Sequence, residues 1–162
     1  MRRQDREVTD EARIEQIIDS CGCCRVAFNT PEGPYIVPLN FGYALGAPAK
    51  FYFHGAKEGR KIDLMGAGTQ VGFELDGAHA LGQAEQACKH TWFYQSVIGT
   101  GYLAPVEDRE EKKRALSCIM AHYRKDQTFS FTDAQADAVA VFCLTVQTMS
   151  CKEQRSNREE DT

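Results

Sequence analysis

KFYFHGAKEGRKIDL, residues 50–64, is the stretch around which the rest of this chain is organised. It begins as an apolar strand that ends at His54, passes Gly59, and enters a short helix headed by Arg60 and Lys61. Free N–H groups of a first helical turn, the helix dipole and two cations together suit a phosphate, which Gly59 lets the backbone approach. A solvated Gly-Arg-Lys turn beside a surface helix explains the same residues, and from this stretch alone that simpler interpretation is favoured.

The composition of the whole chain fits one ordinary globular domain. Its 162 residues can bury a substantial core, and its hydrophobic content of 43% and charged content of 26% are average. The net charge of −4 argues against nucleic acid as a partner, and no apolar run approaches the length of a membrane span. The N-terminal residues MRRQDREVTDE lack the apolar segment of a secretory signal, so we expect a cytoplasmic protein.

The seven cysteines are scattered through otherwise periodic segments, which is unlike a disulfide framework. Cys21 and Cys24 have the C-x-x-C spacing of a redox pair or of half a zinc site. A zinc site needs a second ligand pair, and the sequence contains no other such spacing of cysteines or histidines. The pair precedes a predicted strand instead of following one, so we expect buried small apolar residues here and no metal site.

Hydrophobic periodicity predicts six strands and few helices. The helices are an amphipathic segment from Asp10 to Ser20, a longer one from Asp108 to Tyr123, and a short one capped by Thr132 and Gln135. A weakly patterned segment, residues 77–89, fits a long hairpin with a loose tip. The predicted strands are Arg25–Asn29, Tyr35–Ala44, Lys50–His54, Gln70–Asp76, Trp92–Leu103 and Val139–Met149.

Proline and glycine positions refine this pattern. Pro38 lies inside the second strand, where it cannot donate a ladder hydrogen bond; it indicates an edge, a bulge or a ligand contact. Gly99 and Gly101 indicate a bend in the fifth strand. We therefore predict a mainly β fold, a six-stranded antiparallel barrel with peripheral helices. One domain is expected over residues 1–151, followed by a polar, disordered tail over residues 152–162.

Three stretches together resemble one known family. They are VPLNFGY (residues 37–43), FYFHGAKEGRK (51–61) and SVIGTG (96–101), and MRRQDREVTD and EDREEKKRALSCIM fit as well. The chain resembles the FMN-binding split-barrel family related to pyridoxamine 5′-phosphate oxidase, and within it the 5-nitroimidazole-resistance (Nim) group. The resemblance implies a split β-barrel and favours the phosphate interpretation of the Gly-Arg-Lys turn.

The resemblance also implies a binding site for FMN at the interface of a homodimer. By position, Arg60 and Lys61 would hold the phosphate, with Gly59 opening the turn. The positions that would lie against the flavin ring are Val37, Pro38, Leu39, Asn40, Phe53, His54, Ser96 and Val97. An apolar slot with cations for the phosphate is what a flavin requires.

His54 is the candidate catalytic residue, because its position in the motif is close to the flavin in Nim relatives. Imidazole titrates near neutral pH, so His54 would donate a proton to a reduced nitro substrate. A histidine that only shapes the pocket is the alternative.

The function implied is an FMN-dependent oxidoreductase that reduces small nitroaromatic compounds such as 5-nitroimidazoles. Oxidation of vitamin B6 is disfavoured, because the C-terminal aromatic, arginine and proline residues that hold that substrate are missing here. Two alternatives remain: a protein that binds or sequesters flavin without efficient turnover, and a split barrel that binds another cofactor such as haem.

Overall fold

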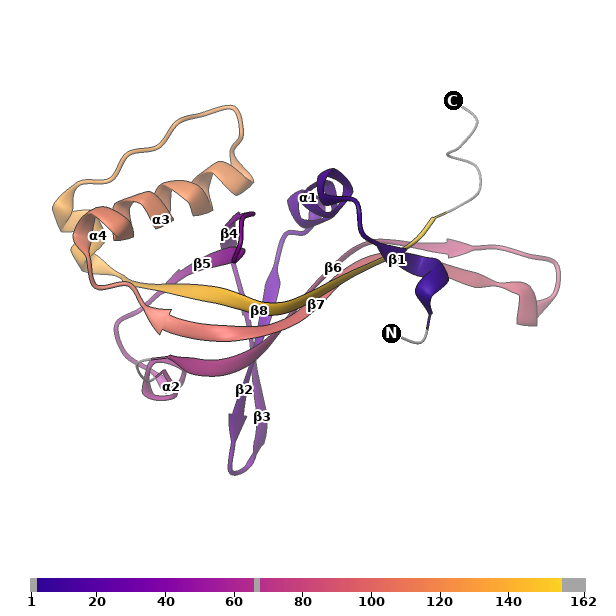
Figure 1. Ribbon diagram of the computed structural model, residues 1–162, viewed down its shortest axis with the longest axis horizontal. Coiled ribbons are helices and arrows are strands. Elements are labelled where there is room, and N and C mark those ends of the chain that lie inside the picture. The colour runs from indigo at the N-terminus through magenta and orange to yellow at the C-terminus, as the bar shows by residue number, and fades with distance from the viewer. Residues whose placement is uncertain (1–2, 66–67, 156–162) are drawn as a thin grey trace.

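The computed structural model describes residues 3–65 and 68–155, and it is built on one twisted antiparallel sheet (Figure 1). In this part of the chain the sheet has eight strands in the order β3-β2-β6-β7-β8-β5-β4, with β1 added to β8. The strands are β1 Glu7–Val8, β2 Cys24–Thr30, β3 Gly33–Leu39, β4 Phe41–Ala44, β5 Lys50–Gly55, β6 Thr69–Gly82, β7 Thr91–Pro105 and β8 Ala140–Gln154. The helices are α1 Glu11–Ser20, α2 Arg60–Asp63, α3 Arg109–Tyr123 and α4 Asp133–Ala138, with short 3₁₀ turns η1 Gln4–Arg6 and η2 Ala87–Lys89.

The two ends of the sheet are neighbours in the sequence. β3 and β4 stand at opposite ends of the strand order, and only Asn40 separates them along the chain. The sheet must therefore curl until its ends meet at Asn40, although it is not closed by a ladder between them. This arrangement confirms the predicted mainly β, split-barrel fold with peripheral helices.

The predicted number of strands was wrong. The segment predicted as one strand over residues 35–44 is two, because the chain leaves its partner β2 at Leu39 and pairs with β5 from Phe41 onward. Pro38 lies in β3, an end strand of the sheet, which agrees with the interpretation of Pro38 as an edge-strand residue. The two-residue β1 brings the total to eight instead of six.

The core lies inside the curl of the sheet. Alternation places Phe51 and Phe53 of β5 in this core with no exposed surface, while Tyr52 and His54 point to the other face. The Phe51 ring packs between the rings of Phe41 and Phe73, at centroid distances of 5.9 Å and 5.2 Å. Aromatic side chains therefore form the centre of the molecule.

Helices α3 and α4 cover the opposite face of β5 and β8. A second buried cluster lies under them, formed by Val106, Ala115, Leu116, Ala136 and Val141. Helix α3 also crosses β4 at Gly42, where an added Cβ would lie 2.5 Å from the Ile119 backbone nitrogen. Only glycine permits this close approach of strand and helix.

The predicted helix starts are confirmed. The side chains of Asp10 and Asp108 accept hydrogen bonds from the backbone N–H groups of Arg13 and Glu111, each at 2.8 Å. Thr132 and Gln135 form a reciprocal capping box at the start of α4. The C-x-x-C residues also lie as expected, with Cys21 and Cys24 buried between α1 and β2.

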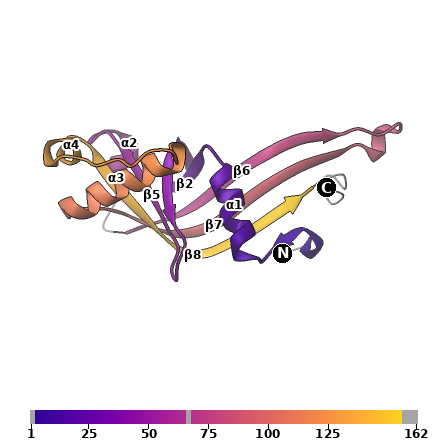
Figure 2. The same cartoon turned by 90° about the horizontal axis from the view of Figure 1, so that it is seen from above.

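Strands β6 and β7 continue beyond the end of β8 as a two-stranded hairpin. We call its projecting part, residues 80–93, the arm; Figure 2 shows it reaching away from the rest of the sheet. The weakly patterned residues 77–89 thus do form a long hairpin, with η2 near its tip.

Three residues predicted to be disordered are part of the sheet. Residues 152–154 belong to β8, because they pair with β7, and Glu153 also accepts hydrogen bonds from Arg13 and Gln95. The rest of the predicted tail, residues 156–162, lies outside the described residues. Among residues 3–65 and 68–155, no helix has both the length and the apolar character needed to cross a membrane.

Candidate functional site

The predicted strand–glycine–helix sequence is present at the end of β5. Gly59 has φ of +114°, in the region that favours glycine, and its carbonyl accepts hydrogen bonds from the N–H groups of Ile62 and Asp63. The single helical turn α2 starts at Arg60, so both cations lie in its first turn.

Arg60 connects this turn to the β2–β3 hairpin. Its guanidinium lies 4.6 Å from the centre of the Tyr35 ring and 3.4 Å from the Glu32 carboxylate. Both charged side chains are largely exposed, at 54% for Arg60 and 74% for Glu32. The contact brings the predicted phosphate ligand next to β3, the strand that carries three predicted ring contacts, Val37, Pro38 and Leu39.

Tyr35 and Glu32 were not predicted as site residues. They are 25 and 28 positions from Arg60, and no sequence spacing links them. The arrangement arises only because the β2–β3 hairpin folds back toward α2.

Lys61 lies over the backbone of Gly55, at the end of β5. A Cβ added at Gly55 would overlap its ammonium group and lie 2.7 Å from its Cε. The end of the Lys61 side chain thus occupies the space that a Cβ at Gly55 would fill, directly after His54.

His54 reaches solvent on the face of β5 away from the core. Partial burial of the ring disfavours the imidazolium and lowers the pKa of His54, and the positive charge of Lys61 lowers it further. His54 is thus predominantly neutral at pH 7, and it becomes a proton donor only under more acidic conditions.

The predicted ring contacts divide into two groups. Pro38 of β3 and the adjoining Asn40 are exposed, while Val37 and Leu39 are half-buried against the core. Phe53 and Val97 have no exposed surface, so neither residue is accessible to a ligand.

Ser96 lies apart from the predicted residues of β3. It lies in β7, paired with Asp76 and Lys152, and β7 is three strands from β3 in the sheet order. At about 4.8 Å per strand, this is about 14 Å along the sheet. The structure therefore brings Lys61 to the end of β5, directly after His54, and Arg60 to Tyr35 of β3, whereas Ser96 lies apart from β3.

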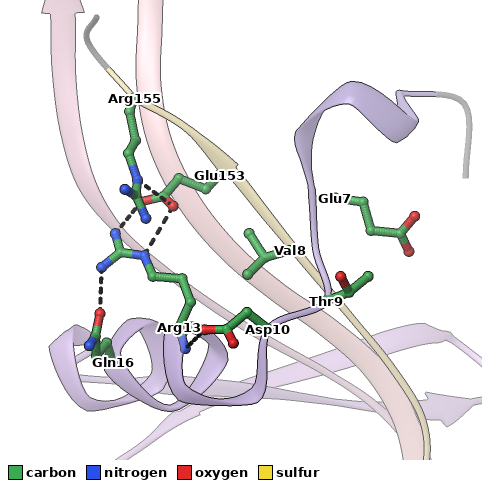
Figure 3. Close-up of a pocket in the computed structure, with 8 residues that line it drawn as sticks. All are labelled: Glu7, Val8, Thr9, Asp10, Arg13, Gln16, Glu153 and Arg155. Atoms are coloured by element: carbon green, nitrogen blue, oxygen red, sulfur yellow. Dashed lines mark hydrogen bonds and ion pairs between the residues drawn. The ribbon is translucent and has the colours of Figure 1, made fainter. Parts of the chain in front are cut away.

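A cavity of about 570 Å³ near the N-terminus lies elsewhere and contains none of the predicted residues (Figure 3). Its wall carries an ion network in which Arg13 and Arg155 both contact Glu153. Burial opposes ionisation of Glu153, but the hydrogen bonds from Arg13, Gln95 and Arg155 outweigh it and hold the pKa of Glu153 below its ordinary value. The network fastens α1 to the end of β8, which is a structural role.

Comparison with known sequences gives the family. The sequence model described as Pyridoxamine 5′-phosphate oxidase matches residues 10–153, which is most of the chain. The chain belongs to the pyridoxamine 5′-phosphate oxidase family. Searching the curated proteins found no match for it.

Solved structures include one relative with substantial sequence identity. It is a candidate 5-nitroimidazole antibiotic resistance protein from Bacteroides thetaiotaomicron, 36% identical, with a TM-score of 0.77 over 91% of this chain and 86% of that one. Two structures with lower sequence identity share the fold of this chain. The FAD and heme binding protein from Mycobacterium smegmatis is 15% identical, with a TM-score of 0.77 over 93% of this chain and 74% of that one. The flavocytochrome Anf3 from Azotobacter vinelandii is 18% identical, with a TM-score of 0.76 over 96% of this chain and 72% of that one.

Proposed function

We propose that this member of the pyridoxamine 5′-phosphate oxidase family binds FMN and reduces small nitroaromatic compounds of the 5-nitroimidazole kind. The observation that carries the proposal is the contact of Arg60 with the β2–β3 hairpin, which joins the cationic turn to β3. The 36% identity to the candidate 5-nitroimidazole resistance protein supports the substrate class.

The residues present fit the phosphate of FMN. Arg60 and Lys61 are adjacent cations in the first turn after Gly59, and among the described residues the one carboxylate that pairs with Arg60 is the exposed Glu32. A solvent-exposed ion pair contributes only about 0–1 kcal/mol, so a phosphate can displace Glu32 from Arg60 at little cost.

The residues of the site have two separate roles, cofactor binding and proton transfer. Arg60 and Lys61 hold the phosphate, and the exposed Pro38 of β3 and the adjoining Asn40 contact the ring. FMN, when bound, supplies the electron-transfer chemistry. His54, next to Lys61, supplies a proton to the substrate when its imidazole is protonated.

Replacing Arg60 with alanine is expected to weaken FMN binding by about 1.5–3 kcal/mol, roughly 10- to 150-fold. The reason is the loss of a charge-assisted contact to the phosphate. Riboflavin has no phosphate, so its affinity should not change. Fluorescence titration of both ligands into the apoprotein measures the difference.

Glu32→Gln is the matched control for Arg60→Ala. It removes the carboxylate that competes for Arg60 and leaves the arginine in place, so FMN affinity should stay the same or increase. Equal affinity of the native protein for FMN and riboflavin would rule out the phosphate role of this turn.

We also propose that the functional unit is a homodimer. Alternation along β7 places Trp92, Ile98 and Tyr102 on the face away from the core, and their exposed fractions are 52%, 53% and 45%. Leu81, opposite Trp92 in the arm, is also exposed. Such an apolar stripe on β7, bordered by Glu74 opposite Ile98, favours a protein partner, and a second copy would also bring another Ser96 toward the site.

Ile98→Asp is expected to convert the dimer to a monomer, because it places a charge in the middle of this stripe. Light scattering over a range of protein concentrations measures the change. Leu45→Asp is the control, since Leu45 is an exposed apolar residue on the β4–β5 loop and lies outside the stripe. A native protein that is monomeric with a full complement of FMN would refute the dimer.

A further inference from the structure

A small apolar cavity lies between α2 and the first residues of β8. Its volume is about 240 Å³, which is the volume that about eight molecules occupy in liquid water. The wall residues are apolar: Ile62 from α2, Pro105 and Val106 after β7, and Val139, Val141 and Phe142 around the start of β8. We call it the β8 pocket. It has room for one aromatic ring and a small substituent.

Two lysines and one carboxylate lie at the rim of the β8 pocket. They are Lys57 from the loop after β5, Lys112 from α3, and Glu107. Within the described chain neither lysine has an ion pair, whereas the neighbouring Lys113 pairs with Glu110 and Asp133. The rim therefore carries a net positive charge in a protein whose overall charge is −4.

The β8 pocket is next to the candidate catalytic residue. His54 pairs with Val141 and Gly55 pairs with Ala140, and both β8 residues line the pocket. Directly opposed residues of neighbouring strands point to the same face, with Cβ atoms about 5 Å apart. The imidazole of His54 is thus on the same side of the sheet as Val141, whereas Ala140 and Phe142 point to the core side.

We propose that the β8 pocket binds small aromatic carboxylic acids, the ring against the apolar wall and the carboxylate between Lys57 and Lys112. This inference rests on the proposed function in one respect: the bound acid would be a substrate, a nitroaromatic acid placed beside His54. Ring burial provides the affinity, and the unpaired lysines provide the preference for an anion.

The test compares 4-nitrobenzoate with the neutral 4-nitrobenzyl alcohol, by calorimetric titration into FMN-free and FMN-loaded protein. The acid is expected to bind about fivefold more tightly than the alcohol, the effect of two partly exposed charge pairs. Lys57→Gln combined with Lys112→Gln should remove this preference and leave the alcohol affinity unchanged. High salt should weaken binding of the acid alone.

A second double variant, Lys89→Gln with Arg114→Gln, is the control, since it removes the same charge at positions that do not line the pocket. Equal affinities of acid and alcohol in the native protein would overturn the inference, as would an equal loss of preference in the control variant. Displacement of 4-nitrobenzoate by an equimolar concentration of inorganic phosphate would also overturn it, because the site would then recognise any anion.

The same titrations separate this inference from the proposed function. If the protein binds FMN and reduces a neutral nitroimidazole but shows no preference for the acid, only the β8 pocket assignment fails. If it binds 4-nitrobenzoate in a lysine-dependent way but does not bind FMN, the proposed function fails and the pocket assignment stands.

Discussion

Reoxidation of the reduced flavin by a 5-nitroimidazole is expected to slow by about 10²–10⁴-fold when His54 is replaced with alanine, under conditions where the imidazole is protonated. The flavin absorption spectrum should stay intact, because His54 is not among the proposed phosphate ligands. Stopped-flow spectroscopy of the reduced protein measures this rate directly. His90→Ala is the control, since His90 is an exposed histidine of the arm.

The pH dependence of this rate follows from the environment of His54. Burial and the charge of Lys61 lower the pKa of His54, so the imidazolium accumulates only below the ordinary titration range of about pH 6.5. The native rate should therefore increase as pH falls below about 6.5, and the rate of His54→Ala should stay flat. Lys61→Gln, by removing the repelling charge, should move the increase to higher pH.

Two results would contradict the proton-donor role. Loss of flavin from His54→Ala would make His54 structural, and a native reoxidation rate in the variant would show that another group supplies the proton. The second result would favour a protein that binds flavin without efficient turnover. Flavin or haem bands in the absorption spectrum of the purified protein would distinguish that case from a haem-binding split barrel.

The largest loss of stability is expected from Phe51→Ala, at about 3–5 kcal/mol. Phe51 has no exposed surface and contacts the rings of Phe41, Tyr43 and Phe73, so its removal leaves a cavity at the centre of the core. Urea unfolding at one fixed protein concentration measures the change, because stability of a dimer depends on concentration.

Phe51→Leu is the matched variant, since it keeps most of the buried volume and should cost substantially less than the alanine change. Tyr52→Ala tests the opposite face of the same strand, where the side chain is only half-buried. A loss for Tyr52→Ala as large as that for Phe51→Ala would mean that the core is not centred on the β5 aromatics.

The local structure of this protein could be predicted from the sequence alone. Alternation separated Phe51 and Phe53 from Tyr52 and His54, and the caps at Asp10, Asp108 and Thr132 marked three helix starts. These signals depend on residues within one or two turns, so they can be read without knowing the fold. The family motifs likewise identified the family and its split barrel.

Only the tertiary structure decided which distant residues meet. The break at Asn40 exists because β3 and β4 pair with different strands at the two ends of the sheet. Arg60 meets Tyr35 through the β2–β3 hairpin, and Lys57, Lys112 and Val141 border one pocket although they come from three separate segments. Burial of Phe53 and Val97, the separation of Ser96, and the extension of β8 through Gln154 were also set by packing. The physical reason is that such contacts depend on how the whole chain folds back on itself, and local patterns of polarity carry no information about that path.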